Sequence, residues 1–330
     1  MKSTEAYHGG NLQEAETRFG RPNEGWLDLS TGINATPYPH TTLSEAAWQR
    51  LPQAAAEAAL LEAARRYYKV PENIEIVATP GSQTLLQLLP SLLPNRKVAI
   101  LGPTYEEHEK LWTTTARRIW TISAFAEAEG ADTVVLVNPN NPDGHTIAPA
   151  DLLDLARTLP KPDGLLVVDA AFADLNASCS VLPHMKGAPI LSIRSFGKFF
   201  GLPGLRLGFA VGAAPIIVAL RERLGPWAVS GPALEIGARA LADTAWIERT
   251  HDALMARAKA LDNILSHTGL TVIGGTALFR LVQSETVPDL FKRLGAAGIF
   301  VRQFYDRKDL LRFGVPGTQE DMARLQRALG

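Results

Sequence analysis

The chain has 330 residues, of which 33 are lysine or arginine and 34 are aspartate or glutamate, so its formal net charge is -1. Apolar residues make up 46% and charged residues 20%, a composition typical of a folded globular protein and not of a disordered one. The balanced charge argues against a nucleic acid as the main partner. At about 150 residues per domain, the length predicts roughly two domains.

The single cysteine, Cys179, excludes an intrachain disulfide and a metal site built from several cysteines. The chain starts without the apolar segment of a secretory signal. Apolar runs such as residues 164–171 are far shorter than the roughly 18–20 residues that a membrane span needs. We therefore expect no membrane association, no bound metal and a cytoplasmic location.

The first half of the chain predicts an α/β layer. Residues 1–41 are rich in Gly, Asn, Pro and Thr, which predicts an extended arm with turns. Residues 42–69 are typical of a helix that is broken near Pro52. Short apolar segments then alternate with helical ones, which indicates a mostly parallel sheet with helices on both faces. The expected strands are residues 74–79, 97–101, 118–122, 133–139, 164–170, 188–195 and 205–212, and the expected helices are residues 82–93 and 150–159.

After about residue 213 the pattern changes to that of a smaller α+β domain. It opens with a long helical region over residues 232–266. The further expected strands are residues 271–274, 277–282, 298–302 and 309–315, and the further helices are residues 286–296 and 318–329. We thus predict an N-terminal arm (1–41) that covers the active site as part of the small domain, a large domain (42–225) and a small C-terminal domain (226–330).

The most informative segment is SFGKFFGLPGLRLGF, residues 195–209, which places Lys198 in a glycine-punctuated loop between two expected strands. A Walker A phosphate loop would need Ser or Thr after Gly-Lys, but Phe199 follows, and the glycine spacing does not fit a dinucleotide motif either. Aromatic neighbours desolvate an amine and make it a better nucleophile toward an aldehyde. Arg206 offers a planar fork of donors for a phosphate, and Ser195 adds a hydroxyl. The alternative is a solvated loop lysine.

This segment resembles the lysine segment of fold-type I pyridoxal-phosphate (PLP) enzymes, the aminotransferase class I/II group, because Ser195, Lys198 and Arg206 fall at that family's spacing. The resemblance implies PLP as the cofactor and Lys198 as the catalytic lysine that binds it covalently. It also implies the fold-type I transferase fold, in which helices sandwich the mostly parallel sheet of a large domain and a smaller α+β domain follows.

Two further segments fit the same family. In the first, Gly81, Ser82 and Gln83 start an expected helix, where free backbone N–H groups and the helix dipole favour an anion. By resemblance they would bind the cofactor phosphate, and an ordinary helix cap is the alternative. The turn NPNNPDG is similar to the family's NPNNPTG, which implies that Asn141 contacts the phenolic oxygen of the cofactor.

Two more residues complete the set of cofactor contacts that the resemblance implies. Asp169 ends an expected strand, and a carboxylate beside the pyridine nitrogen keeps that nitrogen protonated. Tyr105 would stack on the cofactor, so it joins Lys198 and Asp169 among the catalytic candidates. Many relatives carry a tyrosine that donates to the phenolic oxygen; this chain has Phe172 there, which cannot donate.

The segments YHGGNLQEAETRFG and WLDLSTGINATPYP, within residues 7–39, resemble the start of threonine-phosphate decarboxylases of cobalamin synthesis. Arg312 stands at the family's carboxylate-binding position, where an arginine can form a bidentate clamp. The substrate-binding residues that the resemblance implies are His8, Gly9 and Asn11 near a phosphate, Gly32, Ile33 and Asn34 near a carboxylate, and Arg312. Arg280, Arg302 and Arg307 are further candidates for a phosphate pocket.

The resemblance covers the chain from His8 to the C-terminal helix. It implies a lyase that decarboxylates L-threonine O-3-phosphate to (R)-1-amino-2-propanol O-2-phosphate, and a homodimer to which Tyr38 could supply a cross-subunit contact. The first alternative is a histidinol-phosphate-type aminotransferase acting on a phosphorylated amino acid. The second is a non-catalytic PLP-fold binding protein, against which the full set of cofactor residues argues.

Overall fold

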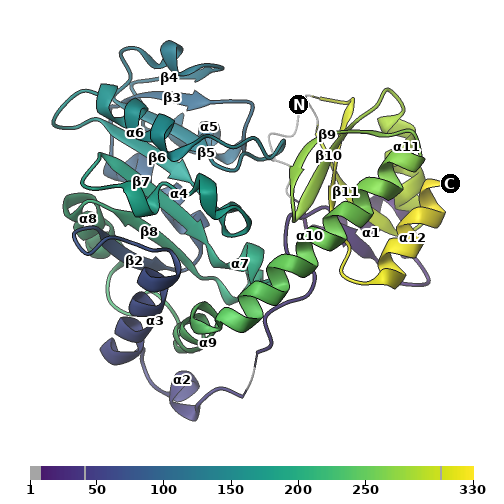
Figure 1. Cartoon of the computed structure of the whole chain (residues 1–330), viewed down its shortest axis with the longest axis horizontal. Coiled ribbons are helices and arrows are strands. Elements are labelled where there is room, and N and C mark those ends of the chain that lie inside the picture. The colour runs from purple at the N-terminus through teal and green to yellow at the C-terminus, as the bar shows by residue number, and fades with distance from the viewer. Residues whose placement is uncertain (1–8, 41, 305–306) are drawn as a thin grey trace. The chain divides into compact units, whose positions relative to one another are not determined.

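The computed structural model describes residues 9–40, 42–304 and 307–330 and divides into two compact units (Figure 1). Unit 1 contains the chain up to Pro37, the segment Pro142–Gly144 and residues Ile247–Gly330. Unit 2 contains Tyr38–Asn141 and His145–Trp246. The sequence predicted a boundary near residue 225. The division instead falls after Trp246, because helix α9 (Gly231–Ala242) packs against α3 (Ala54–Tyr67) of unit 2.

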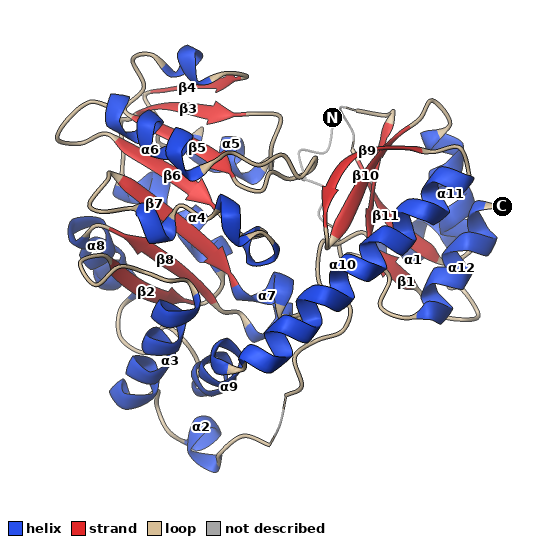
Figure 2. Ribbon diagram, in the orientation of Figure 1, coloured by secondary structure: helices blue, strands red, loops and turns tan. Residues whose placement is uncertain are grey.

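Unit 2 is built around a seven-stranded sheet, as the apolar segments predicted (Figure 2). β8 is antiparallel to both of its neighbours, β2 and β7, and all other neighbouring pairs are parallel. In spatial order the strands are β2 (Glu75–Thr79), β8 (Gly208–Gly212), β7 (Ile190–Ser195), β6 (Leu165–Asp169), β5 (Thr133–Val137), β3 (Lys97–Leu101) and β4 (Arg118–Ile122).

Apolar side chains from the strands and from three helices form one core cluster. Those helices are α4 (Ser82–Leu92), α5 (Glu107–Trp112) and α8 (Ala214–Leu224). Leu85 and Leu89, four residues apart on one face of α4, are both buried there. α5 was not expected from the sequence, and Trp112 fixes it to the core. The remaining helices are α2 (Glu45–Gln49), α3, α6 (Pro149–Thr158), α7 (Phe196–Phe199) and α9.

Unit 1 has a five-stranded sheet covered by helices, which matches the expected α+β pattern. Its order is β1 (Leu27–Leu29), β11 (Ile299–Gln303), β12 (Leu310–Gly314), β10 (Phe279–Gln283) and β9 (Thr271–Thr276). Its helices are α1 (Leu12–Phe19), α11 (Val287–Ala296), α12 (Gln319–Leu329) and most of α10 (Thr244–His267).

The N-terminal segment is more regular than the extended arm that the sequence predicted. The side chain of Asn11 accepts a hydrogen bond from Glu14 N–H and caps α1. The Phe19 ring at the end of this helix packs against Phe291. β1 pairs in parallel with β11, more than 260 residues later in the chain. The expectation was wrong because a three-residue strand and a short helix are stabilised by distant partners, which local periodicity does not reveal.

A buried ion pair joins Asp174, in the segment after β6, to Arg194 of β7. Arg194 Nη2 is 3.2 Å from Asp174 Oδ1, with both side chains almost fully buried, and burial raises the pKa of the Asp174 carboxyl. We expect Asp174→Asn to lower the free energy of unfolding by about 3 kcal/mol, because it leaves a buried guanidinium without its charge partner. Urea unfolding monitored by circular dichroism would measure this. The double variant Asp174→Leu, Arg194→Met should recover most of the loss, and equal losses in both variants would contradict the prediction.

Candidate active site

Most of the predicted cofactor residues gather at one edge of the unit 2 sheet. Because β2 runs in the same direction as β3, β4, β5, β6 and β7, the carboxyl ends of all six strands lie at this edge, and β8 begins there. Ligands of open α/β sheets bind at this edge. Asp169 is the last residue of β6 and Ser195 the last of β7. Tyr105 follows β3, Asn141 follows β5, and Arg206 precedes β8.

The Arg206 guanidinium lies beside the N-terminus of α4. Gly81 has a φ of 83°, and a Cβ on it would collide with the Arg206 guanidinium. A Cβ on Gly208 would lie 2.5 Å from the backbone nitrogen of Ser82. The guanidinium therefore lies against the first turn of α4, where Ser82 and Gln83 present backbone N–H groups without helical partners. Arg206 adopts a left-handed φ of 54°, which is rare outside glycine and often marks a functional site.

Lys198 lies in the one-turn helix α7, not in the open loop that the sequence predicted. Its Nζ is 5.6 Å from the centre of the Phe172 ring, and Phe172 is itself buried. Phe196 and Phe199, on either side of Lys198, are fully buried. The amine thus lies near an aromatic ring, as the sequence predicted.

Asp169 is buried and held by two donors. Its Oδ1 accepts a hydrogen bond of 3.1 Å from Ala171 N–H, and its Oδ2 is 3.1 Å from His108 Nε2. His108 is 2% exposed and belongs to α5. Sequence reasoning missed this histidine. Its only local signal was its position three residues after Tyr105, which lies just before α5.

The NPNNPDG turn is fixed by its first and third residues. Asn138 N–H donates to the Asp169 carbonyl at 2.8 Å, and the Asn138 amide donates to Ile147 O at 3.0 Å. The Asn140 backbone N–H donates to His145 O at 2.8 Å. These bonds hold the backbone on both sides of Asn141 at the edge where β5 and β6 end.

In unit 1, two buried arginines face each other across neighbouring strands. Arg302 of β11 pairs in register with Arg312 of β12, and their exposed fractions are 8% and 7%. Arg312 Nη2 donates to Ser30 O at 3.0 Å. Two guanidiniums at neighbouring positions offer several N–H donors to one anion.

The other two arginines considered for a phosphate pocket are neutralised by aspartates. Arg280 Nη2 donates to Asp262 at 3.0 Å, and the Arg280 Nε forms a second bond to the same carboxylate. Arg307 contacts Asp309 at 3.1 Å near the surface, where it holds the pKa of the Asp309 carboxyl down at about 2. Arg302 is the most deeply buried of the three candidates, at 8% exposed.

The substrate-binding residues predicted near the N-terminus lie in different surroundings. His8 lies outside the described residues. A Cβ on Gly9 would collide with Ser30 O, so Gly9 lies against the carbonyl that Arg312 also contacts. Asn11 serves as the cap of α1. Gly32 is buried and Ile33 half-buried.

Two further residues of this stretch are held by their own unit. Asn34 is buried, and its Oδ1 accepts bonds from Thr36 N–H and from Arg257. Tyr38, in unit 2, is engaged within its own chain: its ring packs on Trp246 and its hydroxyl is 3.3 Å from Asp243.

Among the described residues, no helix is long and apolar enough to cross a membrane, and no group of three or more His, Cys, Asp or Glu could hold a metal ion.

A family model described as aminotransferase class I and II matches residues 26–329. The chain belongs to this family. Two members named threonine-phosphate decarboxylase are similar over nearly the whole chain: one from Sinorhizobium sp is 41% identical, covering 98% of this chain and 97% of its own length, and one from Pseudomonas aeruginosa is 38% identical, covering 98% and 96%.

The class I and II fold is also evident from solved structures. Histidinol-phosphate aminotransferase from Sinorhizobium meliloti, determined in complex with pyridoxal-5'-phosphate, has a TM-score of 0.76 at 21% identity, covering 99% of this chain and 94% of the other. The expected fold-type I architecture is thereby confirmed.

Proposed function

We propose that this chain is a threonine-phosphate decarboxylase that binds pyridoxal 5'-phosphate and releases carbon dioxide from L-threonine O-3-phosphate. The observation that carries the proposal is the 41% and 38% identity to two proteins of that name over nearly their full lengths. The geometry of each unit supplies groups that suit the cofactor and a substrate with two anionic groups.

The residues at the sheet edge fit the cofactor part by part. Arg206 and the first turn of α4 suit its phosphate, and the glycine at position 81 leaves room for the guanidinium. Asp169, buried and doubly hydrogen-bonded, suits a protonated pyridine nitrogen. Lys198 supplies the amine, and Tyr105 an aromatic ring. When bound, PLP supplies an electron sink for the bond that breaks at the substrate α-carbon.

The chain's own residues then bind and orient the substrate. Lys198 would hold the cofactor and, when released from it, would deliver a proton to the α-carbon after carbon dioxide leaves. Arg312 would bind the carboxylate with a planar fork, and Arg302 would bind the phosphate. The grip of Arg312 on the carboxylate would orient the substrate, and this orientation would select decarboxylation or transamination.

The deciding experiment is a product assay. The purified chain with PLP and L-threonine O-3-phosphate should release carbon dioxide and form aminopropanol phosphate without any 2-oxoacid. Formation of pyridoxamine phosphate that depends on a keto acid, with no gas released, would instead identify a transaminase such as one acting on histidinol phosphate. The absence of both, with no cofactor bound, would leave the non-catalytic alternative.

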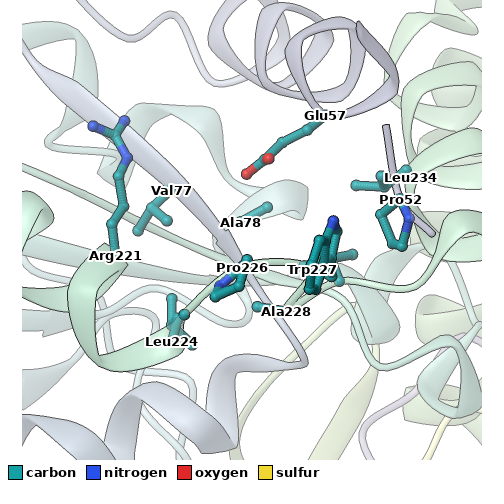
Figure 3. A pocket seen from close by; sticks show the side chains of 12 residues that line it. Pro52, Glu57, Val77, Ala78, Arg221, Leu224, Pro226, Trp227, Ala228 and Leu234 are labelled. Atoms are coloured by element: carbon teal, nitrogen blue, oxygen red, sulfur yellow. The ribbon is translucent and has the colours of Figure 1, made fainter. Parts of the chain in front are cut away.

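The proposal includes a homodimer that acts in the cytoplasm. Cys179 is buried as a free thiol, which suits a reducing compartment. Three large apolar side chains of unit 2, Trp48, Leu51 and Trp227, are 70%, 59% and 59% exposed. Trp227 and Pro52 also line a cavity of about 220 Å³ (Figure 3). Large exposed apolar side chains of this kind are typical of protein interfaces, which supports a second copy as the partner.

We expect Trp227→Asp to convert the dimer into a monomer, because the substitution places a charge in the apolar interface. Light scattering coupled to gel filtration would measure the mass. Met255→Asp, at a second exposed apolar side chain in unit 1, is the matched control and should leave the mass unchanged. A wild-type chain that is already monomeric at micromolar concentration would contradict the dimer.

A further inference from the structure

We infer that His108 is a positioning residue for the cofactor: by donating its Nε2–H to Asp169, it fixes the orientation of the carboxylate that faces the pyridine nitrogen. This inference rests on the proposed role of Asp169. It is independent of which reaction follows, because it concerns cofactor binding alone.

The contact leaves the Asp169 carboxylate little freedom. The distance from His108 Nε2 to Asp169 Oδ2 is 3.1 Å, and the other oxygen accepts from Ala171 N–H at the same distance. Rotation of the carboxylate about its Cβ–Cγ bond would break both bonds. An ionised carboxylate can only accept hydrogen bonds, so the proton of a neutral His108 must be on Nε2. The bond is then one to a charged acceptor in a nearly water-free place, where such bonds are strong.

His108 is in turn held by the first turn of α5. Its side chain is 2% exposed, and its backbone N–H donates to Tyr105 O at 3.1 Å. The His108 and Tyr105 rings meet edge to face, with 6.1 Å between their centres. The neighbouring Glu107 accepts a bond of 3.2 Å from Gln83 Nε2 at the start of α4. One turn of helix thus connects three of the proposed cofactor contacts, Tyr105, Asp169 and Gln83.

This arrangement explains why two consecutive polar residues are buried in a helix of only six residues. Glu107 and His108 are 6% and 2% exposed. Buried polar side chains are retained when each has a hydrogen-bonding partner. The partners here are Asp169 for His108 and Gln83 for Glu107, and both are proposed cofactor residues. Burial of Trp112 in the core cluster anchors the other end of the helix.

The test compares four variants of the full chain. His108→Phe keeps a flat apolar ring but removes the donor, whereas His108→Gln keeps an Nε2–H donor. Trp112→Phe is the matched structural control on the same helix, and Asp169→Asn removes the group through which His108 is inferred to act. Equilibrium dialysis measures the dissociation constant of PLP, and absorption spectroscopy records the visible band of the bound cofactor.

His108→Phe should weaken PLP binding by about tenfold and shift the visible band, as expected for loss of one bond to a charged group. Under the proposed reaction, kcat should fall while the KM for L-threonine O-3-phosphate stays within about twofold, because the substrate anions are bound elsewhere. His108→Gln should restore affinity and spectrum. Trp112→Phe should lower the unfolding temperature but leave the PLP affinity and the spectrum unchanged.

A double-mutant cycle supplies the strongest check. In an Asp169→Asn background, His108→Phe should have no further effect on PLP affinity. Any of three results would overturn the inference. They are equal loss of PLP affinity in His108→Phe and His108→Gln, additive effects in the cycle, and wild-type affinity in His108→Phe. PLP affinity is measured without substrate, so it is unaffected if the decarboxylase proposal fails. If Asp169→Asn binds PLP like the wild-type chain, the proposed role of Asp169 fails instead.

Discussion

Lys198→Ala is expected to abolish carbon dioxide release from L-threonine O-3-phosphate, with a loss in kcat of at least about 10³-fold. The variant loses both the amine that would hold the cofactor and the group that would deliver a proton to the α-carbon. Its fold should persist, because Lys198 is half-buried and does not belong to the apolar core cluster. Trapped gas and aminopropanol phosphate are the measured products. Borohydride should fix the cofactor to Lys198 of the wild-type chain and to no residue of the variant.

Lys292→Ala is the matched control for this prediction. Lys292 lies on the surface of α11 in unit 1, where its side chain is 74% exposed and pairs with Asp289. Exposed pairs of this kind contribute little to stability, so activity and unfolding temperature should both remain those of the wild-type chain. A Lys198→Ala variant that still turned over at the wild-type rate would place the chemistry on another residue.

Arg302→Met should remove activity while the chain stays folded. Arg302 and Arg312 are buried and pair in register across β11 and β12. Methionine keeps much of the apolar volume of the arginine stem, so the variant should still unfold cooperatively in urea. The same change should lower kcat/KM by a factor of about 100, or roughly 3 kcal/mol, because the substrate phosphate loses its charged partner.

Two measurements decide this prediction: urea unfolding of the cofactor-bound chain, and steady-state kinetics with L-threonine O-3-phosphate. Arg327→Met, an exposed position on α12, is the control and should change neither quantity by more than about 0.5 kcal/mol. If Arg302→Met lost stability and kept its kcat/KM, the arginine would be a structural residue and the phosphate would bind elsewhere.

The cofactor residues were predicted from short segments of local chemistry together with the family resemblance, and their roles stay predictions. A reactive lysine needs aromatic neighbours and glycine turns, and residues 195–209 carry both within one segment. A phosphate site needs a helix start after a strand, and the strand and helix around Gly81 showed the correct periodicities. The parallel sheet then brings these segments together, because all of them follow strands that end at one edge.

The N-terminal segment was less predictable. Local pattern indicated an extended arm, whereas the structure contains α1 and β1. A three-residue strand such as Leu27–Leu29 carries too few positions for a period-two signal, and its hydrogen-bonding partner is β11 at the other end of the chain. The substrate role assigned to Asn11 by resemblance is a separate prediction, and the structure adds that this side chain caps α1.

The sequence by itself determined which chemistry the chain carries, because lysine, aspartate and arginine appear in short segments whose spacing is local. Only the tertiary structure decided which distant residues contact those groups and hold them in place. His108 meets Asp169 across 61 positions of sequence, and Arg302 faces Arg312 across two strands while Arg280 is neutralised by Asp262. These contacts depend on strand order, register and burial, and such long-range quantities leave no repeating pattern along the chain.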